Sequence, residues 1–341
     1  HQLSRGLGDV YKRQGVEFES FDRFLLELTR SRGAKVVRRL VRGLEWNDGR
    51  PTPVHPDGRG PAYDLVAIAS GVNSRLLQQI DAPGAAYRRP TTMPTYICEF
   101  RFDEEIVRTC FGPSMHVFLL DMPRLEFAAL IPKGDVVTMC LLGDDIDDAL
   151  VHAFLNTPEV RACFPGGSPP DVAACTCSPN INVRPNGPPY GDRFVVVGDG
   201  GVTRLYKDGI GAAYRTAKAA ASAAVFGGIS ESAFRERFGP ACRRIASDNR
   251  IGKFIFAVNQ QIRRRRISRR TILRMVAREQ AGVSLYRPMS EVLWDLFTGS
   301  APYREVFLNT LRPGFLAGVG RNLASSVLTP RPAERSHDAV R

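Results

Sequence analysis

The 341-residue sequence lacks any apolar run near the roughly 18 residues that a membrane-spanning helix requires. Its opening residues also lack the apolar core of a secretory signal. The chain has only seven cysteines, an odd number, so a reducing compartment is expected and a disulfide framework is not. Its length is enough for two or three domains, and with 43% hydrophobic residues it can bury a large core. We therefore predict a cytoplasmic globular protein.

Metal-ligand patterns are missing as well. Cys175 and Cys177 form a single C-x-C without a second pair at zinc spacing, and the five histidines form neither H-x-x-x-H nor H-E-x-x-H. We predict no metal site.

Excess positive charge is confined to the last third of the chain. Residues 228–341 contain 21 Lys+Arg and 9 Asp+Glu, whereas the remainder contains 26 of each, and "RRRRISRRTILR" at 263–274 is the densest part. Apolar residues at helical spacing accompany it: Ile251, Phe254, Ile255, Val258, Ile262, Ile272, Leu273 and Val276. This pattern is typical of a solvated cover on the rest of the protein, or of a helix on an anionic membrane surface. Nucleic acid is not predicted as a partner, because no aromatic residues are interleaved with the arginines.

Residues 1–85 begin with an unusual segment, and the rest of this range predicts one helix and two strands. The first 14 residues, "HQLSRGLGDVYKRQ", resemble a translated sequencing adapter, and a native polar tail is the alternative. Ser20 is predicted to cap a helix that Gly33 ends, with an apolar stripe of Phe21, Phe24, Leu25 and Leu28. A strand-like segment at 34–46 and a turn-rich segment at 46–61 follow. "YDLVAIASG" is a continuous apolar run, which predicts a strand covered on both faces.

Residues 91–143 change character to short, partly alternating strands, in "TYICEFRF", "MHVFLLDM", "LEFAALIP" and "DVVTMCLLG". Residues 132–135 supply a hairpin between the last two. Beyond them we predict a helix at 144–155, loops with a strand in "DVAACTCS", and helices over 230–328. Aromatic residues from Trp294 to Phe315 indicate a helical cap, with the lining of a lipid-like substrate channel as the alternative.

The stretch "RFVVVGDGGVTRLYKDGIGAAYRTAKAAA" at 193–221 carries the strongest chemical signal. Its apolar strand places Gly198 and Asp199 at the carboxyl end of a buried strand, where open α/β sheets bind ligands. Asp199 can accept hydrogen bonds from sugar-like hydroxyls there. A helix that begins near Gly209 offers free N–H groups and the positive end of its dipole, and its glycines allow close approach. This combination suits a flavin, and a structural crossover capped by the aspartate is the alternative.

The same stretch resembles the second FAD-binding motif of the superfamily of para-hydroxybenzoate-hydroxylase-like monooxygenases and geranylgeranyl reductases. There a strand leads to Gly-Asp, a loop, and then Gly-x-Gly-Ile-x-x-Ala. The resemblance implies that Asp199 contacts the ribityl or pyrophosphate part of FAD, and that the 209–212 backbone faces the flavin N1–C2=O edge. The loop "TRLYKD" is shorter than the family's and lacks its proline. The predicted cofactor-binding residues are Gly198, Asp199, Gly209, Ile210, Gly211 and Ala212.

Three further segments resemble the superfamily in the same order. "FDRFLLELTRSRGAKV" resembles a helix and strand before its middle region, and "YDLVAIASGVNSRLL" resembles "DLVIGADGVNSRLR", with Ser70 in place of the acidic residue. "LEFAALIPKGD" resembles the reductases' Y-x-W-x-F-P-K strand, with Phe127, Ala129 and Ile131 in place of aromatics that shape the substrate cavity. Because the acidic residue helps support FAD and the nicotinamide donor in the hydroxylases, Ser70 favours a reductase.

The resemblance implies an α/β fold: a partial FAD/NAD(P)-binding Rossmann-like domain with an inserted antiparallel β-sheet substrate domain and a helical C-terminal region. The predicted ranges are 1–14 non-native, 15–85 and 191–228 FAD-binding domain, 86–190 substrate domain, 229–330 basic helical region and 331–341 flexible tail. The family's G-x-G-x-x-G segment is missing, because GLG at 6–8 and GVG at 318–320 lack the third glycine. We therefore expect a chain truncated at its N-terminus that binds FAD weakly or not at all.

We predict an FAD-dependent oxidoreductase, a reductase of an apolar, isoprenoid- or lipid-like unsaturated substrate, with NAD(P)H or a ferredoxin-like protein as electron donor. One alternative is an FAD-dependent monooxygenase. Another is a non-catalytic fragment that binds an anionic membrane surface, on its inner face, through the basic helix. No side chain stands out as an acid or base; Tyr206, Lys207 and Asp208 in the flavin-side loop are proton donors or simply loop structure.

Overall fold

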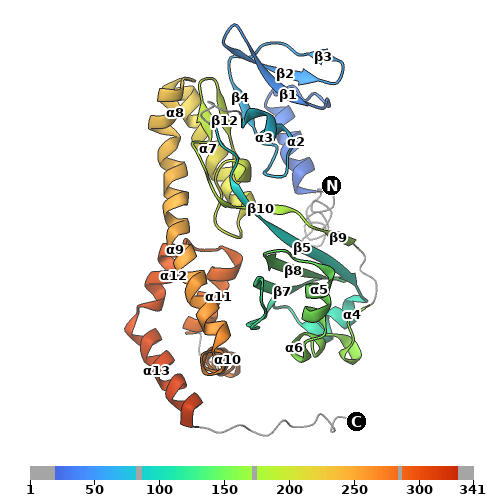
Figure 1. Cartoon of the computed structure of the whole chain (residues 1–341), viewed down its shortest axis with the longest axis vertical. Coiled ribbons are helices and arrows are strands. Elements are labelled where there is room, and N and C mark those ends of the chain that lie inside the picture. Colours follow the sequence, from blue (N-terminus) through green and yellow to red (C-terminus); the bar gives the residue numbers. More distant parts are fainter. Residues whose placement is uncertain (1–19, 82–86, 171–174, 283–285, 329–341) are drawn as a thin grey trace.

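The computed structural model describes residues 20–81, 87–170, 175–282 and 286–328. Figure 1 shows a small α/β region at the top, an antiparallel sheet at the lower right, and helices along the other side. This is the predicted mixed α/β architecture with an antiparallel sheet and a helical C-terminal region. The segments 1–14 and 331–341, predicted as a non-native start and a tail, lie outside the described residues.

Helix α2 (Phe21–Ser31) forms as the sequence predicts. The Oγ atom of Ser20 accepts a hydrogen bond from the N–H of Arg23 at 3.1 Å, and Gly33, with φ +90°, follows the helix end. None of its residues is buried, and Leu25 is 41% exposed. The apolar stripe of α2 therefore marks a side of the helix that the described residues do not bury.

The strand-like segment at 34–46 becomes a strand only at its end. There β1 (Gly43–Asn47) pairs with β2 (Arg50–His55), and β3 (Gly58–Arg59) completes an antiparallel sheet. The residues before β1 form no ladder with another described strand, and Val37 is exposed.

The prediction of a turn-rich segment at 46–61 is wrong where β2 forms. Asp48 and Gly49 have positive φ values of 48° and 71°, which suits a two-residue hairpin between β1 and β2. The Asp-Gly pair carried this signal, but Pro51 and Pro53 in β2 obscured it because proline argues against a strand.

A pair of parallel strands in the upper region positions the site. β4 (Val66–Ile68) pairs in parallel with β12 (Phe194–Val196), and β11 (Tyr190–Gly191) pairs antiparallel with β12. β12 is buried along its length, as predicted. The prediction that β4 is covered on both faces is wrong, because Ala67 is exposed. Its register partner Val195 packs in a core with α7, whose covering does not reach Ala67 on the edge strand.

The large antiparallel sheet has the strand order β10-β5-β8-β7-β6, and β9 also pairs with β5. Its strands are β5 (Thr91–Arg101), β6 (His116–Val117), β7 (Leu125–Lys133), β8 (Val136–Gly143), β9 (Cys175–Cys177) and β10 (Asn180–Arg184). The strands predicted in "TYICEFRF", "LEFAALIP" and "DVVTMCLLG" are confirmed, whereas "MHVFLLDM" contributes only the short β6. In "DVAACTCS" the strand is β9, and residues 171–174 lie outside the described residues. Gly134, with φ +63°, lies in the predicted hairpin between β7 and β8.

Helix α5 begins later than the predicted residue 144. Asp147 caps it, because its carboxylate accepts the N–H of Leu150 at 2.8 Å. Phe154 of α5 and Val160 of α6 are fully buried in the core of the large sheet. The short helices are α3 (Leu76–Ile80), α4 (Glu104–Ile106), α5 (Asp148–Leu155) and α6 (Pro158–Arg161).

The helical region is built on α9, which Figure 1 shows running from the upper region toward the lower end of the molecule. The helices are α7 (Gly209–Gly227), α8 (Glu231–Arg237), α9 (Gly239–Arg264), α10 (Arg266–Ala281), α11 (Pro288–Thr298), α12 (Tyr303–Thr310) and α13 (Pro313–Leu328). Near the end of α9 the buried Arg263 donates hydrogen bonds to the carbonyls of Leu125 and Glu126 at 2.5 and 2.9 Å. It thereby joins the helices to β7. None of the described helices is both long and apolar enough to cross a bilayer.

Candidate functional site

The two parallel strands end side by side, and their turns are joined by Asp199. This residue follows β12 in the short helical turn η3 (Gly198–Gly200), and its Oδ1 atom accepts the N–H of Val72, after β4, at 3.2 Å. Gly71, the residue before Val72, has a left-handed φ of +77°. Among the described residues, nothing donates a hydrogen bond to the Oδ2 atom of Asp199, which is only partly buried. One carboxylate oxygen thus holds the protein together and the other remains available.

Two side chains donate hydrogen bonds to the carbonyl groups of the turn after β12. Asn182 of β10 donates hydrogen bonds to the carbonyls of Asp199 and Gly201 at 2.8 and 3.2 Å. The hydroxyl of Tyr87 donates to the carbonyl of Gly200 at 2.7 Å. Burial raises the pKa of Tyr87 well above its usual value, so this phenol stays neutral and remains a donor. The turn is therefore fixed without any ligand.

The first turns of α7 pack directly against this turn. Gly198, with φ +73°, donates its N–H to the Oγ1 atom of Thr216 at 2.8 Å. A Cβ atom on Gly198 would lie 3.5 Å from the Cβ of Ala213, so the strand end and the helix start are in contact. The structure thus brings together the two halves of the predicted motif.

Fewer backbone N–H groups are free at the start of α7 than the predicted range 209–212 implies. The N–H of Ala212 already donates to the carbonyl of Asp208 at 2.9 Å, and its side chain is fully buried. Asp208 makes no side-chain cap on the helix. Gly209 and Ile210 are exposed, and a Cβ atom on Gly209 would meet nothing within 4 Å. The N–H groups of residues 209–211 are therefore the ones that can face a ligand.

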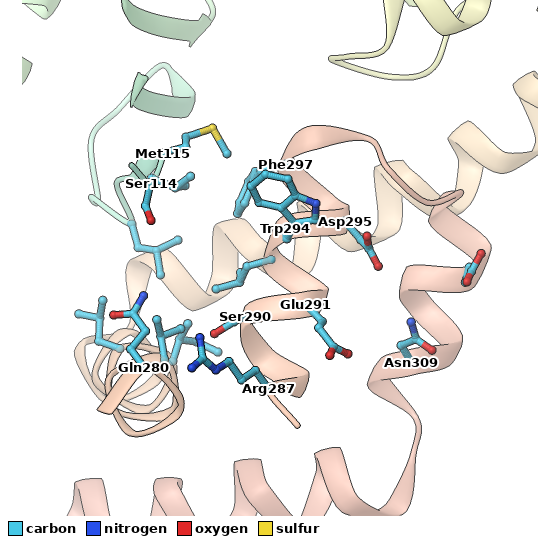
Figure 2. Close-up of a pocket in the computed structure, with 17 residues that line it drawn as sticks. Ser114, Met115, Gln280, Arg287, Ser290, Glu291, Trp294, Asp295, Phe297 and Asn309 are labelled. Carbon is cyan, nitrogen blue, oxygen red and sulfur yellow. The ribbon is translucent and has the colours of Figure 1, made fainter. Parts of the chain in front are cut away.

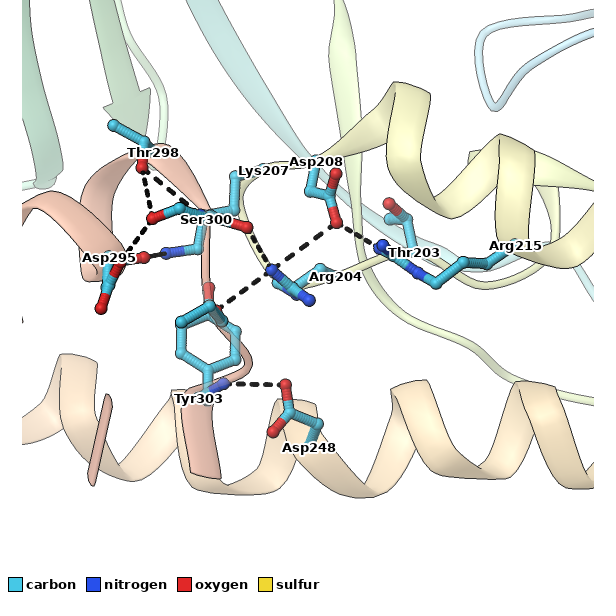
Figure 3. A network of polar contacts seen from close by, with 12 residues as sticks. Thr203, Arg204, Lys207, Asp208, Arg215, Asp248, Asp295, Thr298, Ser300 and Tyr303 are labelled. Atoms are coloured by element: carbon cyan, nitrogen blue, oxygen red, sulfur yellow. Dashed lines mark hydrogen bonds and ion pairs between the residues drawn. The ribbon is translucent and has the colours of Figure 1, made fainter. Parts of the chain in front are cut away.

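The loop between the two halves is held in an unusual backbone conformation. Tyr206 and Asp208 have left-handed φ values of 64° and 62°, which cost free energy in residues other than glycine. Arg204 offsets this cost by donating to the carbonyls of Gly299 and Ala301 at 2.5 and 3.2 Å, as Figure 3 shows. Arg204 also lies 3.6 Å from the carboxylate of Asp208, which contacts Arg215 on its other side (Figure 3).

Residues far along the chain complete the support of this loop. The fully buried Tyr303 donates its hydroxyl to the carbonyl of Leu205 at 2.5 Å. Asn249 accepts the N–H of Leu205 at 2.9 Å and donates to the carbonyl of Thr203 at 2.8 Å. Asp248 accepts the N–H of Tyr303 at 2.9 Å (Figure 3). Sequence reasoning missed these residues, because nothing local in "SDNR" or "APYR" signals a contact with residues 203–208.

Lys207 is the most perturbed ionisable group in this loop. Its ammonium lies 4.5 Å from the ring centre of Tyr303 and 3.5 Å from the carbonyl of Asp295, at the end of α11. The pKa of Lys207 is lowered from 10.5 to about 7, mainly by burial and also by Arg204, while Asp208, Asp248 and Asp295 act in the opposite direction. Lys207 can therefore hold or release a proton near neutral pH.

The depressed pKa of Lys207 predicts that the protein becomes more stable as the pH rises above 7. Between pH 7 and about pH 10 the unfolded chain binds this proton and the folded chain does not, so folding is favoured by roughly 1.4 kcal/mol for each pH unit. Urea unfolding should show that the free energy of unfolding of the wild type increases from pH 7 to pH 9, and that this increase is absent from Lys207→Met. Equal pH dependence of the two proteins would contradict a buried, proton-poor Lys207.

Cavities lie in a row beside this loop. A pocket of about 740 Å³ opens between residues 114–119 and helices α10 to α12, as Figure 2 shows. Phe297 lines both this pocket and a small inner cavity of about 20 Å³ beside Lys207. Tyr206 and Phe256 line both the inner cavity and a third space of about 290 Å³ against α9. Neighbouring spaces thus share aromatic side chains in their walls.

Two aromatic rings are in contact beside the inner cavity, and one of them, Phe297, also lines the outer pocket. The ring centres of Phe127 on β7 and Phe297 on α11 are 5.2 Å apart, with an angle of 31° between the planes. Phe127 stands where the resembling reductase strand has an aromatic residue that shapes the substrate cavity, and in this structure it lines the inner cavity. Phe297 belongs to the segment interpreted mainly as a helical cap, yet it lines the outer pocket as well (Figure 2). No group of three or more His, Cys, Asp or Glu is placed to hold a metal ion within the part of the chain that the structure describes.

No protein-family model and no curated protein sequence matches the chain. Solved structures share its fold. A variant of the halogenase PltM in complex with FAD has a TM-score of 0.55 at 13% identity, over 91% of this chain and 68% of that chain. The flavin-dependent halogenase BrvH from Brevundimonas sp. BAL3 has a TM-score of 0.52 at 16% identity, over 91% and 66%. A geranylgeranyl bacteriochlorophyll reductase-like protein from Thermoplasma acidophilum has a TM-score of 0.57 at 12% identity, over 90% and 74%.

These likenesses confirm the predicted fold. The chain has the fold of flavin-dependent halogenases and of a geranylgeranyl reductase-like protein, and spans about two thirds to three quarters of their length.

Proposed function

We propose that this chain, which has the fold of these flavin-dependent proteins, is an FAD-dependent oxidoreductase. The observation that carries the proposal is the arrangement around Asp199: one fixed carboxylate oxygen, one available oxygen, and the free start of α7 packed against the same turn. Sugar-like hydroxyls and an electron-rich ring edge are the chemistry that such a pair recognises.

The described residues fit FAD at the flavin end of the molecule. The Oδ2 atom of Asp199 would accept hydroxyl hydrogen bonds, and the N–H groups of residues 209–211 would face the N1–C2=O edge. Gly198 and Gly209 would allow the close approach, because neither carries a side chain. FAD, when bound, supplies the hydride or electron transfer, with NAD(P)H as the proposed donor.

The proposed substrate is an apolar, unsaturated molecule. The aromatic and aliphatic side chains around the inner cavity support this choice, and because that cavity of about 20 Å³ is too small for a substrate, Phe297 would have to move aside for one to reach Lys207. The outer pocket, with a volume in the range of ligand sites, would supply the route of entry past Phe297. Lys207, which titrates near neutral pH, would hold the proton that a reduced double bond requires.

A reductase is favoured over a monooxygenase by Ser70. It stands where the resembling hydroxylase segment has an acidic residue, and its side chain is exposed. An FAD-dependent monooxygenase is the second candidate, because flavin-dependent halogenases share the fold.

The proposed function is tested by titrating the chain with FAD and following flavin fluorescence and absorbance. We expect saturable binding, sought up to millimolar FAD because the sequence contains no G-x-G-x-x-G segment. With FAD, a reductant and an isoprenoid alkene, a reductase yields product with saturated bonds in the absence of oxygen. Substrate-triggered oxygen consumption with a hydroxylated product would favour the monooxygenase, and no saturable FAD binding would contradict both.

A further inference from the structure

The apolar stripe that suggested an amphipathic membrane helix lies mainly inside the protein. Ile251 and Ile255 of α9, and Ile272 and Val276 of α10, pack against the buried core of the helical region. Phe254, Val258 and Leu273 of the same pattern are exposed, so only part of the stripe is withdrawn from solvent. The arginines next to it occupy a different position.

The end of α9, the start of α10 and the end of α13 meet at one place. Thr271 of α10 lies 3.4 Å from Ser326 of α13, oxygen to oxygen, and Arg278 donates to Asn322 at 2.6 Å. These contacts place the last turn of α13 beside the second turn of α10. Figure 1 shows α10 and α13 at the lower end of the molecule.

The arginines at this end divide into two groups. Arg263 is buried against β7, and Arg269 donates to the carbonyl of Arg263, so both support the fold. Arg264, Arg265 and Arg266 are exposed, and no carboxylate of a described residue forms an ion pair with them. The structure thus leaves a compact positive charge at the junction of α9 and α10.

Exposed apolar side chains lie beside this charge. Ile267, directly after the arginines, is 45% exposed, and Val327 and Leu328 at the end of α13 are 64% and 80% exposed. Arginines with neighbouring exposed aliphatic residues are typical of protein surfaces that lie on anionic lipid. The sequence separates these two groups by about 60 residues, and only the packing of α13 against α10 brings them together.

We propose that this tip, formed by residues 264–267 with Val327 and Leu328, docks on an anionic lipid surface. The arginines attract the headgroups, and the three aliphatic side chains enter the interface between headgroups and acyl chains. No aromatic residue lies in the tip to stack on bases, which argues against single-stranded nucleic acid as its partner. The proposal is independent of FAD, because neither Asp199 nor α7 belongs to the tip.

Cosedimentation of the whole chain with vesicles tests the proposal. Binding is expected to vesicles that contain about 30% phosphatidylserine and not to pure phosphatidylcholine, and it should weaken strongly between 50 and 500 mM salt. Replacing Arg264, Arg265 and Arg266 by glutamine should lower the affinity about 100-fold. A double variant, Val327→Ser with Leu328→Ser, should weaken the part of the vesicle binding that remains at 500 mM salt.

A matched control removes the same charge elsewhere. The exposed Arg30, Arg32 and Arg38, replaced by glutamine, should leave vesicle binding almost unchanged. Thermal unfolding checks that both triple variants are folded. The proposal is overturned if vesicle binding ignores phosphatidylserine, if both triple variants lose affinity equally, or if the chain binds single-stranded DNA but no vesicle.

Discussion

Replacing Asp199 by asparagine is expected to weaken FAD binding by about 10- to 100-fold while leaving the protein almost as stable as wild type. The amide oxygen can still accept the N–H of Val72, so the bond between the two strand turns survives. The amide nitrogen then stands where Oδ2 was and cannot accept a hydroxyl hydrogen bond. Affinity is measured by flavin fluorescence titration, and stability by urea unfolding without FAD.

Asp199→Ala provides the comparison. It removes both oxygens, so it should lose FAD affinity and also about 1–3 kcal/mol of the free energy of unfolding, because the N–H of Val72 loses its acceptor. If the Asp199→Asn variant and the wild type bound FAD equally well, Asp199 would be only a structural link between the turns after β4 and β12, which is the crossover alternative.

Gly252→Ala is expected to destabilise the helical region through a single added methyl group. A Cβ atom at position 252 of α9 would lie 2.6, 2.7 and 3.0 Å from ring atoms of Tyr303. The ring cannot shift easily, because it is fully buried and its hydroxyl is bound to the carbonyl of Leu205. We expect a loss of about 1–3 kcal/mol in the free energy of unfolding, measured with urea.

The matched control is Gly320→Ala in α13. A Cβ atom there would meet nothing within 4 Å, so alanine should stabilise the helix by up to about 1 kcal/mol. Because Tyr303 holds the strained loop at 204–208, Gly252→Ala should also weaken FAD binding, whereas Gly320→Ala should not. Equal stability of the two variants would show that Tyr303 is not fixed as described.

Local patterns predicted the elements that carry their own signal. The helix after Ser20, the strands β5, β7 and β8, and the start of α7 at Gly209 follow from caps, alternation and glycine placement within a few residues. The errors arose where two local signals conflicted. Proline outweighed the Asp48-Gly49 turn in the assignment of β2, and a short apolar run suggested two-sided burial for an edge strand.

The candidate site was predictable only in part. The sequence identified Gly198, Asp199 and the start of α7, because a strand end and a helix start are adjacent along the chain. It included Tyr303 and Phe297 only in a general set of aromatic residues for a helical cap or channel, because their individual contacts are with residues about 100 or more positions away. Such contacts leave no local periodicity or turn signal.

The sequence by itself determined the order of secondary structure, the position of Asp199 at a strand end, and the concentration of arginine in the last third of the chain. Those properties depend on backbone propensity and on charge, which each residue carries wherever the chain folds. The tertiary structure alone decided which oxygen of Asp199 is free, that burial brings the pKa of Lys207 to about 7, and which arginines face solvent. Those properties depend on neighbours that packing supplies, and a buried neighbour changes what an identical side chain can do.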